Sequence, residues 1–560
     1  MAGMTLFLLA AVVYLHTLLN GFVYDDLHQV LEDPRIRSFR GIPEIFSSGV
    51  WSFKWGPSSY YRPLMQLSYL LTFQLAGLRA WAFHLVNVLV HALTVVAVFS
   101  LAAKVLSQVE HREPTRVGAL AAALIYAVHP VLVEPVAWVA AIGDLLMALF
   151  FVLACRLYLS ALEGSTRCYW ATLGCCVLAL LAKEPAVTLP AVLLLIDVLW
   201  SRERDLRRAA VRSTPFVITT VIYLIIRNVV LGGIAPPGLH GDLGTVECYL
   251  TAVHFLGQYL LKELWPFPLN ALYEFHPVAS PLDWRFVSSV ALCAIAAWAV
   301  VAFRHDRRVL LGASLFLVPL LPAMYVPGVG EGGIAERYLC LPTSGFALLL
   351  GMVWSTGARR IDHTTLTWIA LAILTLAVSV VTVSRSFVWR NEESLWTDTV
   401  TKSPGSAVAH EFLAYAHFAS GRLDRSVEEN LIALQLDPRR NNARINLGAS
   451  YSALGRLEQA ATAYYEAIVR EPGSFEAHAG LGFVYTEQNR LGEALEEYRI
   501  ALSINPSHSP SHNGAGVIYG KLGDLRSAER EFAAAVSGDP GNPRYLANLD
   551  QVRQAIRTTT

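Results

Sequence analysis

The sequence predicts an all-α protein with two parts, a polytopic helical membrane domain followed by a solenoid of helical repeats. Three observations support this fold class. The 560 residues are 54% hydrophobic and 16% charged, and apolar runs long enough to cross a bilayer recur as far as Arg385. The share of charged residues then rises, from about a seventh of the positions before residue 401 to about a fifth of positions 401–560. A repeat of about 34 residues begins in the same region.

Residues 1–385 are interpreted as the membrane domain. A spanning helix needs ~20 mostly apolar residues, because unpaired backbone groups are costly in hydrocarbon. About eleven segments qualify, roughly 4–22, 81–103, 117–133, 136–158, 168–182, 185–200, 213–231, 285–303, 309–326, 336–355 and 364–383. The first has no basic leader region or cleavage site and is expected to be retained. A further apolar stretch, 249–265, contains Lys262 and Glu263 and is expected to lie at the interface.

The distribution of Lys and Arg predicts the orientation. With a cytosolic N-terminus, the basic loops after residues 103, 158, 200, 303 and 355 all face the cytosol. Eleven crossings then place the first loop, 21–80, and everything after Arg385 on the outer face. Compact loops and the absence of an Asn-X-Ser/Thr acceptor favour a bacterial inner membrane with periplasmic repeats. The alternative is an endoplasmic-reticulum membrane with lumenal repeats.

Positions 401–560 repeat arithmetically. Prolines recur at a constant interval of about 34 residues, and small turn residues follow the same period: Pro404, Pro438, Pro472, Pro506 and Pro540, with Gly421, Gly455, Asn489 and Gly523. This period is typical of tetratricopeptide repeats, whose helix pairs bury their faces by stacking. We expect a connector over 386–406, four repeats over 407–540 and a capping helix over 541–560. A polypeptide partner is expected on the concave face, for which Tyr415, Phe418, Phe483 and Val517 are candidates unless they pack between repeats.

Composition argues against a nucleic-acid-binding protein and against a protein held together by metal sites or disulfides. Lys plus Arg and Asp plus Glu both total 44, so no nucleic-acid partner is expected from a basic surface. The seven cysteines lie mostly in apolar runs without metal-ligand spacing, so neither a metal site nor a disulfide framework is predicted. His84, Asn87 and His91 share one face of a span, which favours hydrogen bonds between helices over metal ligation.

Ionisable residues collect at the outer ends of the predicted spans. Asp25 and Asp26 follow the first span, where a carboxylate can take a proton from an attacking hydroxyl; either is a candidate catalytic base, or the pair is a solvated turn or helix cap. Charged groups this close to hydrocarbon are candidate functional residues. The supporting polar candidates are His129, Glu134, Asp144, Glu184 and Glu336.

Three basic residues are candidates for binding a phosphate. Arg62, Lys183 and Arg337 are predicted at the outer surface, where Arg grips phosphate with two donors and Lys acts as a point charge. With an acidic base opposite, they describe transfer of a sugar from a polyprenyl-phosphate donor to a hydroxyl, with the phosphate as leaving group. Membrane lipid and the lipid-linked sugar are the expected small-molecule partners.

Several stretches together resemble the transmembrane and tetratricopeptide-repeat (TMTC) O-mannosyltransferases and their bacterial relatives, within the GT-C class of membrane glycosyltransferases. They are residues 21–26 (GFVYDD), 61–64 (YRPL), 83–87 (FHLVN) with His91, His129-Pro130 with Glu134, 182–184 (AKE), 336–339 (ERYL) with Pro342, and the repeats. The resemblance implies a GT-C fold of about eleven spans, a polyprenyl-phosphate mannose donor and inverting transfer to Ser or Thr. It places the base at Asp25 or Asp26, with Asp26 slightly favoured, and leaves metal dependence open.

One stretch departs from the family pattern. Where the fourth span often reads GRAD, residues 141–144 read AIGD, so the arginine before Asp144 is missing. Two other functions stay open. One is a non-enzymatic, membrane-anchored scaffold whose repeats assemble envelope complexes, although anchoring does not need eleven spans. The other is a transporter of lipid-linked intermediates, for which few charges lie in mid-span.

Overall fold

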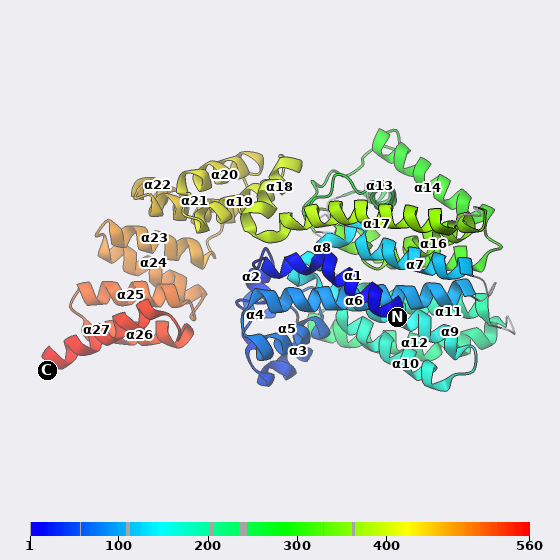
Figure 1. Cartoon of the computed structure of the whole chain (residues 1–560). Helices are drawn as coiled ribbons and strands as arrows, with labels where there is room; N and C mark the ends of the chain where they lie inside the picture. Colours follow the sequence, from blue (N-terminus) through cyan, green and yellow to red (C-terminus); the bar gives the residue numbers. More distant parts are fainter. Residues whose placement is uncertain are drawn as a thin grey trace. The chain divides into compact units, whose positions relative to one another are not determined.

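The structure is a computed structural model that describes residues 2–55, 58–107, 113–201, 205–233, 243–328, 330–360 and 364–559. The described residues form helices and turns and contain no strand. The chain separates into two compact units, Met1–Asp398 and Thr399–Thr560 (Figure 1). The predicted all-α fold is therefore confirmed.

The first unit is a bundle of long helices with short ones between them. The short helices are α2 (Asp26–Gln29), α3 (Ile42–Ser47), α4 (Ser52–Trp55) and α8 (Val133–Ala137). The longer ones are α1 (Ala2–Tyr14), α5 (Pro63–Ala76), α6 (Ala80–Ser107), α7 (Glu113–Val128), α9 (Ile142–Ala161), α10 (Thr166–Ala182), α11 (Leu189–Trp200), α12 (Leu206–Leu231), α13 (Thr245–Leu264), α14 (Trp284–Ala302), α15 (Arg307–Leu317), α16 (Pro342–Arg360), α17 (Thr364–Ser386) and α18 (Glu392–Lys402).

Seven helical segments among the described residues are long and apolar enough to cross a membrane. They are Ala2–Leu19, Ala80–Ser107, Val139–Ala161, Leu206–Leu231, Trp284–Ala302, Arg307–Met324 and Thr365–Arg390. The helices Arg116–Val128 and Pro130–Ala137 meet at a bend of 49°. Counted together as one broken span, they make an eighth. The chain is thus a multi-pass membrane protein.

Three of the eleven predicted spans differ from this set. The 168–182 segment is an apolar helix of only 17 residues. The 185–200 segment begins as a 3-10 turn, Glu184–Thr188, so α11 keeps 12 residues, or about 18 Å, too short for a hydrocarbon core of about 30 Å. The 336–355 segment likewise splits into a 3-10 turn, Glu336–Leu339, and α16. Turns beside polar residues interrupt the apolar pattern that predicted continuous spans.

Helix α6 lies at the centre of the first unit and packs against α1, α7 and α9, as α7 does against α16 (Figure 1). Small residues permit the closest of these approaches. A Cβ added at Gly118 would stand 2.7 Å from the Gly351 carbonyl oxygen, and one at Gly351 would stand 2.5 Å from that of Gly118. Such glycine contacts let helix backbones meet inside a membrane domain.

The second unit is a stack of antiparallel helix pairs (Figure 1). Its helices are α19 (Ala407–Ala419), α20 (Leu423–Leu436), α21 (Asn441–Ala453), α22 (Leu457–Arg470), α23 (Phe475–Glu487), α24 (Leu491–Ile504), α25 (Ser509–Lys521), α26 (Leu525–Gly538) and α27 (Pro543–Thr559). The turn residues Gly421, Gly455, Asn489 and Gly523 all have positive φ, between 59° and 83°, which explains the small residues at this point of the repeat. Helix α27 packs Leu549 and Val552 against Ala528 and Phe532 of α26.

Candidate functional site

The candidate site is built around the first loop, just after the first span. Asp25 and Asp26 stand at the start of α2, and the structure separates their roles. Asp26 is fully buried, and its carboxylate accepts hydrogen bonds from Val23 N at 3.1 Å and Ala140 N at 2.7 Å. Burial raises the pKa of Asp26 well above its ordinary value, although both hydrogen bonds oppose the rise. Asp26 therefore ties the first loop to the turn before α9.

Asp25 keeps its carboxylate open. In the part of the chain that the structure describes, no group donates a hydrogen bond to it, and the residue is partly exposed. Surrounding protein still removes enough water to raise the pKa of Asp25 to about 6, against the lowering effect of the nearby charges of Arg337, His28 and Arg62. A carboxylate with this pKa is ionised at neutral pH and still accepts a proton readily.

Three cation–carboxylate pairs converge on the same region from distant parts of the chain. Arg62 contacts both oxygens of Glu184 through Nε, with Nη2 at 2.9 Å from Oε2. Lys183 Nζ lies 2.6 Å from both oxygens of Asp144. Arg337 donates from Nη1 at 2.6 Å and from its backbone N at 2.9 Å to the two oxygens of Glu134. Each pair joins a helix end or turn to a different helix of the bundle.

These pairs share one electrostatic environment. The charges of Arg62 and Arg337 act on Lys183 and on Asp25 alike, so Arg62, Lys183, Arg337 and Asp25 form one cluster. Arg62 illustrates the effect of pairing, because burial alone would raise the pKa of Glu184 and Arg62 lowers it instead. The structure therefore brings together the predicted phosphate-binding residues and one of the two predicted bases.

Aromatic rings cover these cations. Tyr338 lies under both Lys183 and Arg337, with each charged group 5.3 Å from the ring centroid. Arg337 is also 5.3 Å from the Trp138 centroid, and Arg62 is 4.4 Å from that of Tyr60. The rings hold the cations by cation–π attraction and exclude water around them. Sequence reasoning assigned no role to Trp138, although a tryptophan between two polar helix ends was a usable signal.

Two of the supporting residues lie in a second buried polar cluster. Glu336 accepts hydrogen bonds from Asn270 N and from the Tyr273 hydroxyl. His129 Nε2 lies 3.1 Å from the Glu263 carbonyl oxygen. These contacts bind the turn before α16 to the segment that follows α13, and the bend after α7 to the last turn of α13. The other three supporting residues, Glu134, Asp144 and Glu184, hold the cations described above.

The polar face of α6 makes the hydrogen bonds that its spacing predicted. His84 Nε2 lies 3.2 Å from the Gly21 carbonyl, Asn87 Nδ2 donates to the Trp138 carbonyl at 2.8 Å, and His91 Nε2 lies 3.2 Å from the Ala127 carbonyl. The predicted contact between helices is confirmed for His91, which bonds to α7, whereas the carbonyls of Gly21 and Trp138 that His84 and Asn87 contact lie in connecting segments. Among the described residues, no three His, Cys, Asp or Glu side chains gather as a metal site would require.

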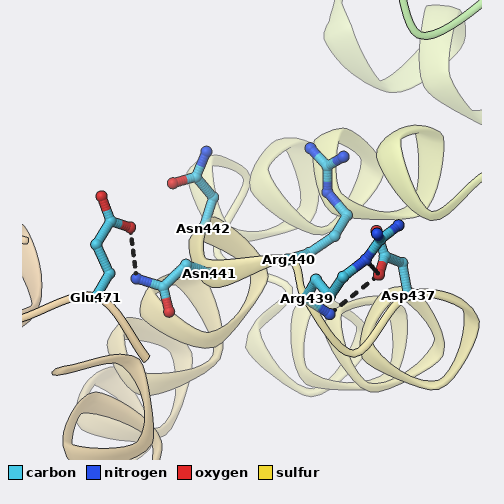
Figure 2. A pocket seen from close by; sticks show the side chains of 6 residues that line it. All are labelled: Asp437, Arg439, Arg440, Asn441, Asn442 and Glu471. Atoms are coloured by element: carbon cyan, nitrogen blue, oxygen red, sulfur yellow. Dashed lines mark hydrogen bonds and ion pairs between the residues drawn. The ribbon is translucent and has the colours of Figure 1, made fainter. Parts of the chain in front are cut away.

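The repeat unit offers two surfaces of interest. Tyr415, Phe418 and Phe483 are 45%, 36% and 41% exposed, as a binding surface would require. Val517 is partly buried and packs against the cluster of Ala528 and Phe532, in line with the alternative that these residues pack inside the stack. Figure 2 shows a polar hollow between the first two repeats, where Asn441 points to Glu471 and Arg439 to Asp437.

Comparison with known sequences identifies relatives of both units. Residues 62–231 match the family described as dolichyl-phosphate-mannose-protein mannosyltransferase, and residues 445–509 match the tetratricopeptide repeat. The chain is 22% identical to protein O-mannosyl-transferase TMTC3 of Mus musculus, over 79% of this chain and 52% of that protein. It is 25% identical to protein O-mannosyl-transferase F38B6.6 of Caenorhabditis elegans, over 77% of this chain and 62% of that protein. The resemblance to the TMTC family is confirmed.

The match covers only part of the length of each TMTC relative. The chain spans about half of the mouse protein's length and about three fifths of the nematode protein's length. A solved structure, a thermophilic TPR protein of Thermus thermophilus, is 19% identical over 32% of this chain and 96% of that one, with a TM-score of 0.28.

Proposed function

We propose that this chain is a membrane glycosyltransferase that transfers mannose from a polyprenyl-phosphate donor to a Ser or Thr hydroxyl of a polypeptide on the outer face of the membrane. The observation that carries the proposal is the open carboxylate of Asp25 beside the cations Arg62, Lys183 and Arg337. A base and a phosphate-binding group at one membrane face are the two requirements of this reaction. The names of the relatives supply the sugar and the class of acceptor.

The transfer step needs one proton acceptor and one stabilised leaving group. Asp25 takes the proton of the acceptor hydroxyl as that oxygen attacks C1 of the sugar. The bond between C1 and the phosphate oxygen breaks, its electron pair stays on polyprenyl phosphate, and the configuration at C1 inverts. The proton then leaves Asp25 for solvent. Arg62, Lys183 and Arg337 stabilise the negative charge that develops on the departing phosphate.

Pairing with carboxylates prepares the cations for this task. Each guanidinium or ammonium is held by an acidic partner, so its position is fixed before the donor binds. Arg337 uses Nη1 for Glu134, and its planar fork retains further N–H groups for a phosphate. The fixed charges therefore act in a region from which protein has displaced much of the water.

Asp25 rather than Asp26 is the base in this proposal. Both oxygens of Asp26 already accept backbone hydrogen bonds and the side chain is fully buried, so an acceptor hydroxyl has no approach to it. Asp25 is partly exposed and faces the charges of Arg337 and Arg62. Asp26 holds the loop that presents it.

The repeat unit completes the proposal as a polypeptide-binding module. Tetratricopeptide stacks present a curved surface to peptides, and Tyr415, Phe418 and Phe483 supply exposed aromatic area of the kind that anchors a peptide. We place these repeats on the outer side, in the periplasm of a bacterium or the corresponding lumen of the endoplasmic reticulum. The hydroxyl acceptor would belong to the bound polypeptide.

The test is transfer of label from radioactive polyprenyl-phosphate mannose to polypeptides of the outer compartment. Purified full-length protein is compared with Asp25→Asn and Asp26→Asn. We expect labelled polypeptide with the unmodified protein, a loss of about 100-fold or more with Asp25→Asn, and a lower folded yield but residual activity per folded molecule with Asp26→Asn. Absence of label from folded wild-type protein, across a panel of polyprenyl-phosphate sugars, would favour the scaffold instead.

A further inference from the structure

Residues at and just after the end of the last span contact the turn that carries Asp25. Gly21 N donates to the Arg390 carbonyl at 3.0 Å, and Tyr24 N donates to Oε1 of Glu392. These partners lie far apart in sequence, and both contacts lie within the first unit. The first loop is therefore fastened at both ends of its turn, at Gly21 and at Tyr24.

Tyr24 needs such support because its backbone is left-handed. Its φ is 55°, a region that residues with a Cβ occupy at a cost in free energy and that persists only where surrounding contacts impose it. The direction in which Asp25 leaves the chain depends on this dihedral angle. Whatever holds Tyr24 therefore also aims the Asp25 carboxylate.

Three tryptophans and one carboxylate provide the support. The Tyr24 ring stacks on Trp138 with centroids 5.5 Å apart and meets Trp396 edge-on at 5.2 Å. Trp138 stacks in turn on Trp389 at 5.8 Å. Glu392 uses its second oxygen, Oε2, to accept from Trp396 Nε1 at 2.8 Å, so one side chain fixes both the backbone of Tyr24 and a ring against it.

We infer that Glu392 is a positioning residue that, with Trp389 and Trp396, clamps the turn at residues 21–25 and so aims the Asp25 carboxylate at the acceptor hydroxyl. The catalytic consequence rests on the proposed function, whereas the clamp itself does not. Glu392 does not touch the reacting atoms; it acts through Tyr24. The clamp stands at the start of α18, the helix that precedes the repeats in sequence.

The clamp is tested first without any substrate. Hydrogen exchange of the full-length protein in detergent is followed in peptides that cover residues 21–31, for wild type, Glu392→Ala and a control, Asp283→Ala. Asp283 is a matched control because its carboxylate also accepts from a backbone N and from a side chain, both of Arg285, at the start of α14. We expect exchange of the 21–31 amides to rise about tenfold in Glu392→Ala and to stay at the wild-type rate in Asp283→Ala.

The catalytic role is tested by kinetics of the same proteins. We expect Glu392→Ala to lower kcat about tenfold or more while the KM for the lipid-linked donor changes by less than about twofold. The acidic limb of the pH profile should move to lower pH, because a released loop gives Asp25 more water. Glu392→Ala should cost less in a Tyr24→Gly background, since glycine adopts positive φ without support.

The outcomes separate the two proposals. Unchanged exchange of residues 21–31 in Glu392→Ala overturns the clamp, whatever the activity. Faster exchange with unchanged kcat and an unmoved acidic limb overturns the positioning role. Folded wild-type protein that transfers no sugar overturns the proposed function, and the exchange experiment still decides whether the clamp exists.

Discussion

The two units of this chain use ionisable side chains in opposite ways. In the repeats, three histidine–glutamate pairs recur with the same geometry, each joining residues 19 positions apart: His410 with Glu429, His478 with Glu497 and His512 with Glu531. In the membrane unit, the three cation–carboxylate pairs join residues 122, 39 and 203 positions apart. The recurring pairs each join the two helices of one repeat, whereas the converging pairs assemble a single site.

Burial sets the Lys183–Asp144 pair apart from the other five of these pairs. Lys183 and Asp144 each expose 4% of their side chains. Arg62 and Glu184 expose 17% and 22%, and His410 and Glu429 expose 7% and 19%. A buried ion pair adds little stability over an apolar pair of the same volume. Its retention therefore points to a use other than folding, and in a membrane domain that use is commonly the reaction site.

The largest expected effect is a loss of stability when the most buried of these ion pairs, Lys183–Asp144, is broken. Lys183→Met leaves Asp144 without its partner in a site closed to water, and we expect the free energy of unfolding to fall by about 3–5 kcal/mol. Thermal unfolding in detergent measures it. The double variant Asp144→Asn with Lys183→Met removes both charges, and we expect it to recover most of the stability while sugar transfer stays lost. A single variant as stable as wild type would show that the pair is not closed to solvent.

The next effect concerns packing between repeats. A Cβ at Gly514 would stand 2.2 Å from Cζ of Tyr498, a rigid ring in the neighbouring helix. We expect Gly514→Ala to lower the free energy of unfolding of the repeat unit by about 1–3 kcal/mol, measured by thermal unfolding. Gly492→Ala is the control, since nothing lies within 4 Å of its Cβ position and alanine is the better helix former. Equal stability of the two variants would contradict close stacking at Gly514.

Sequence reasoning predicted the repeat unit well, for a physical reason. Each repeat buries its face against the next, so the same residue type returns at the same position and spacing alone reveals the fold. The turn glycines and Asn489 at positive φ follow from that period. The period left the place of Val517 open, because periodicity alone does not distinguish a position that faces solvent from one that packs against α26.

The membrane site was predicted only in its components. Residue type and place at a helix end identified Asp25, Arg62, Lys183 and Arg337, but no sequence spacing couples Arg337 to Glu134 across 203 positions. The clamp was missed altogether. Glu392 and Trp396 fall in a segment predicted to be a plain connector, and only the tertiary structure shows that they hold the left-handed Tyr24.

The third prediction tests the open carboxylate of the membrane site through pH. Burial raises the pKa of Asp25 from its ordinary value to about 6, and a general base must be ionised to act. We therefore expect kcat to fall about tenfold per pH unit below 6 and to level off above it. Initial rates between about pH 4.5 and 8 measure this acidic limb of the pH–rate profile. A limb near the ordinary carboxyl pKa would mean that a well-solvated group, rather than Asp25 in this setting, is the base.

The smallest expected effect is in the repeats, at His410. Its Nδ1 lies 2.6 Å from the Glu429 carboxylate and its Nε2 lies 3.1 Å from the Pro404 carbonyl. Both partners are acceptors, so both ring nitrogens must carry hydrogen, and the folded state favours the imidazolium. Burial opposes this charge, but the bond to Glu429 raises the pKa of His410 on balance.

The sign of the pH effect follows from that raised pKa. The stabilisation is fully present below the unfolded value of about 6.5 and is lost as pH rises through the folded value. We expect the repeat unit to lose less than about 1 kcal/mol between pH 6 and 8, and His410→Gln to remove that dependence. His276→Gln, at a histidine exposed beside Glu274, is the control that should leave it unchanged. A pH dependence equal in wild type and His410→Gln would show that the His410–Glu429 pair joins the two helices of its repeat without charge, unlike the pairs of the membrane site.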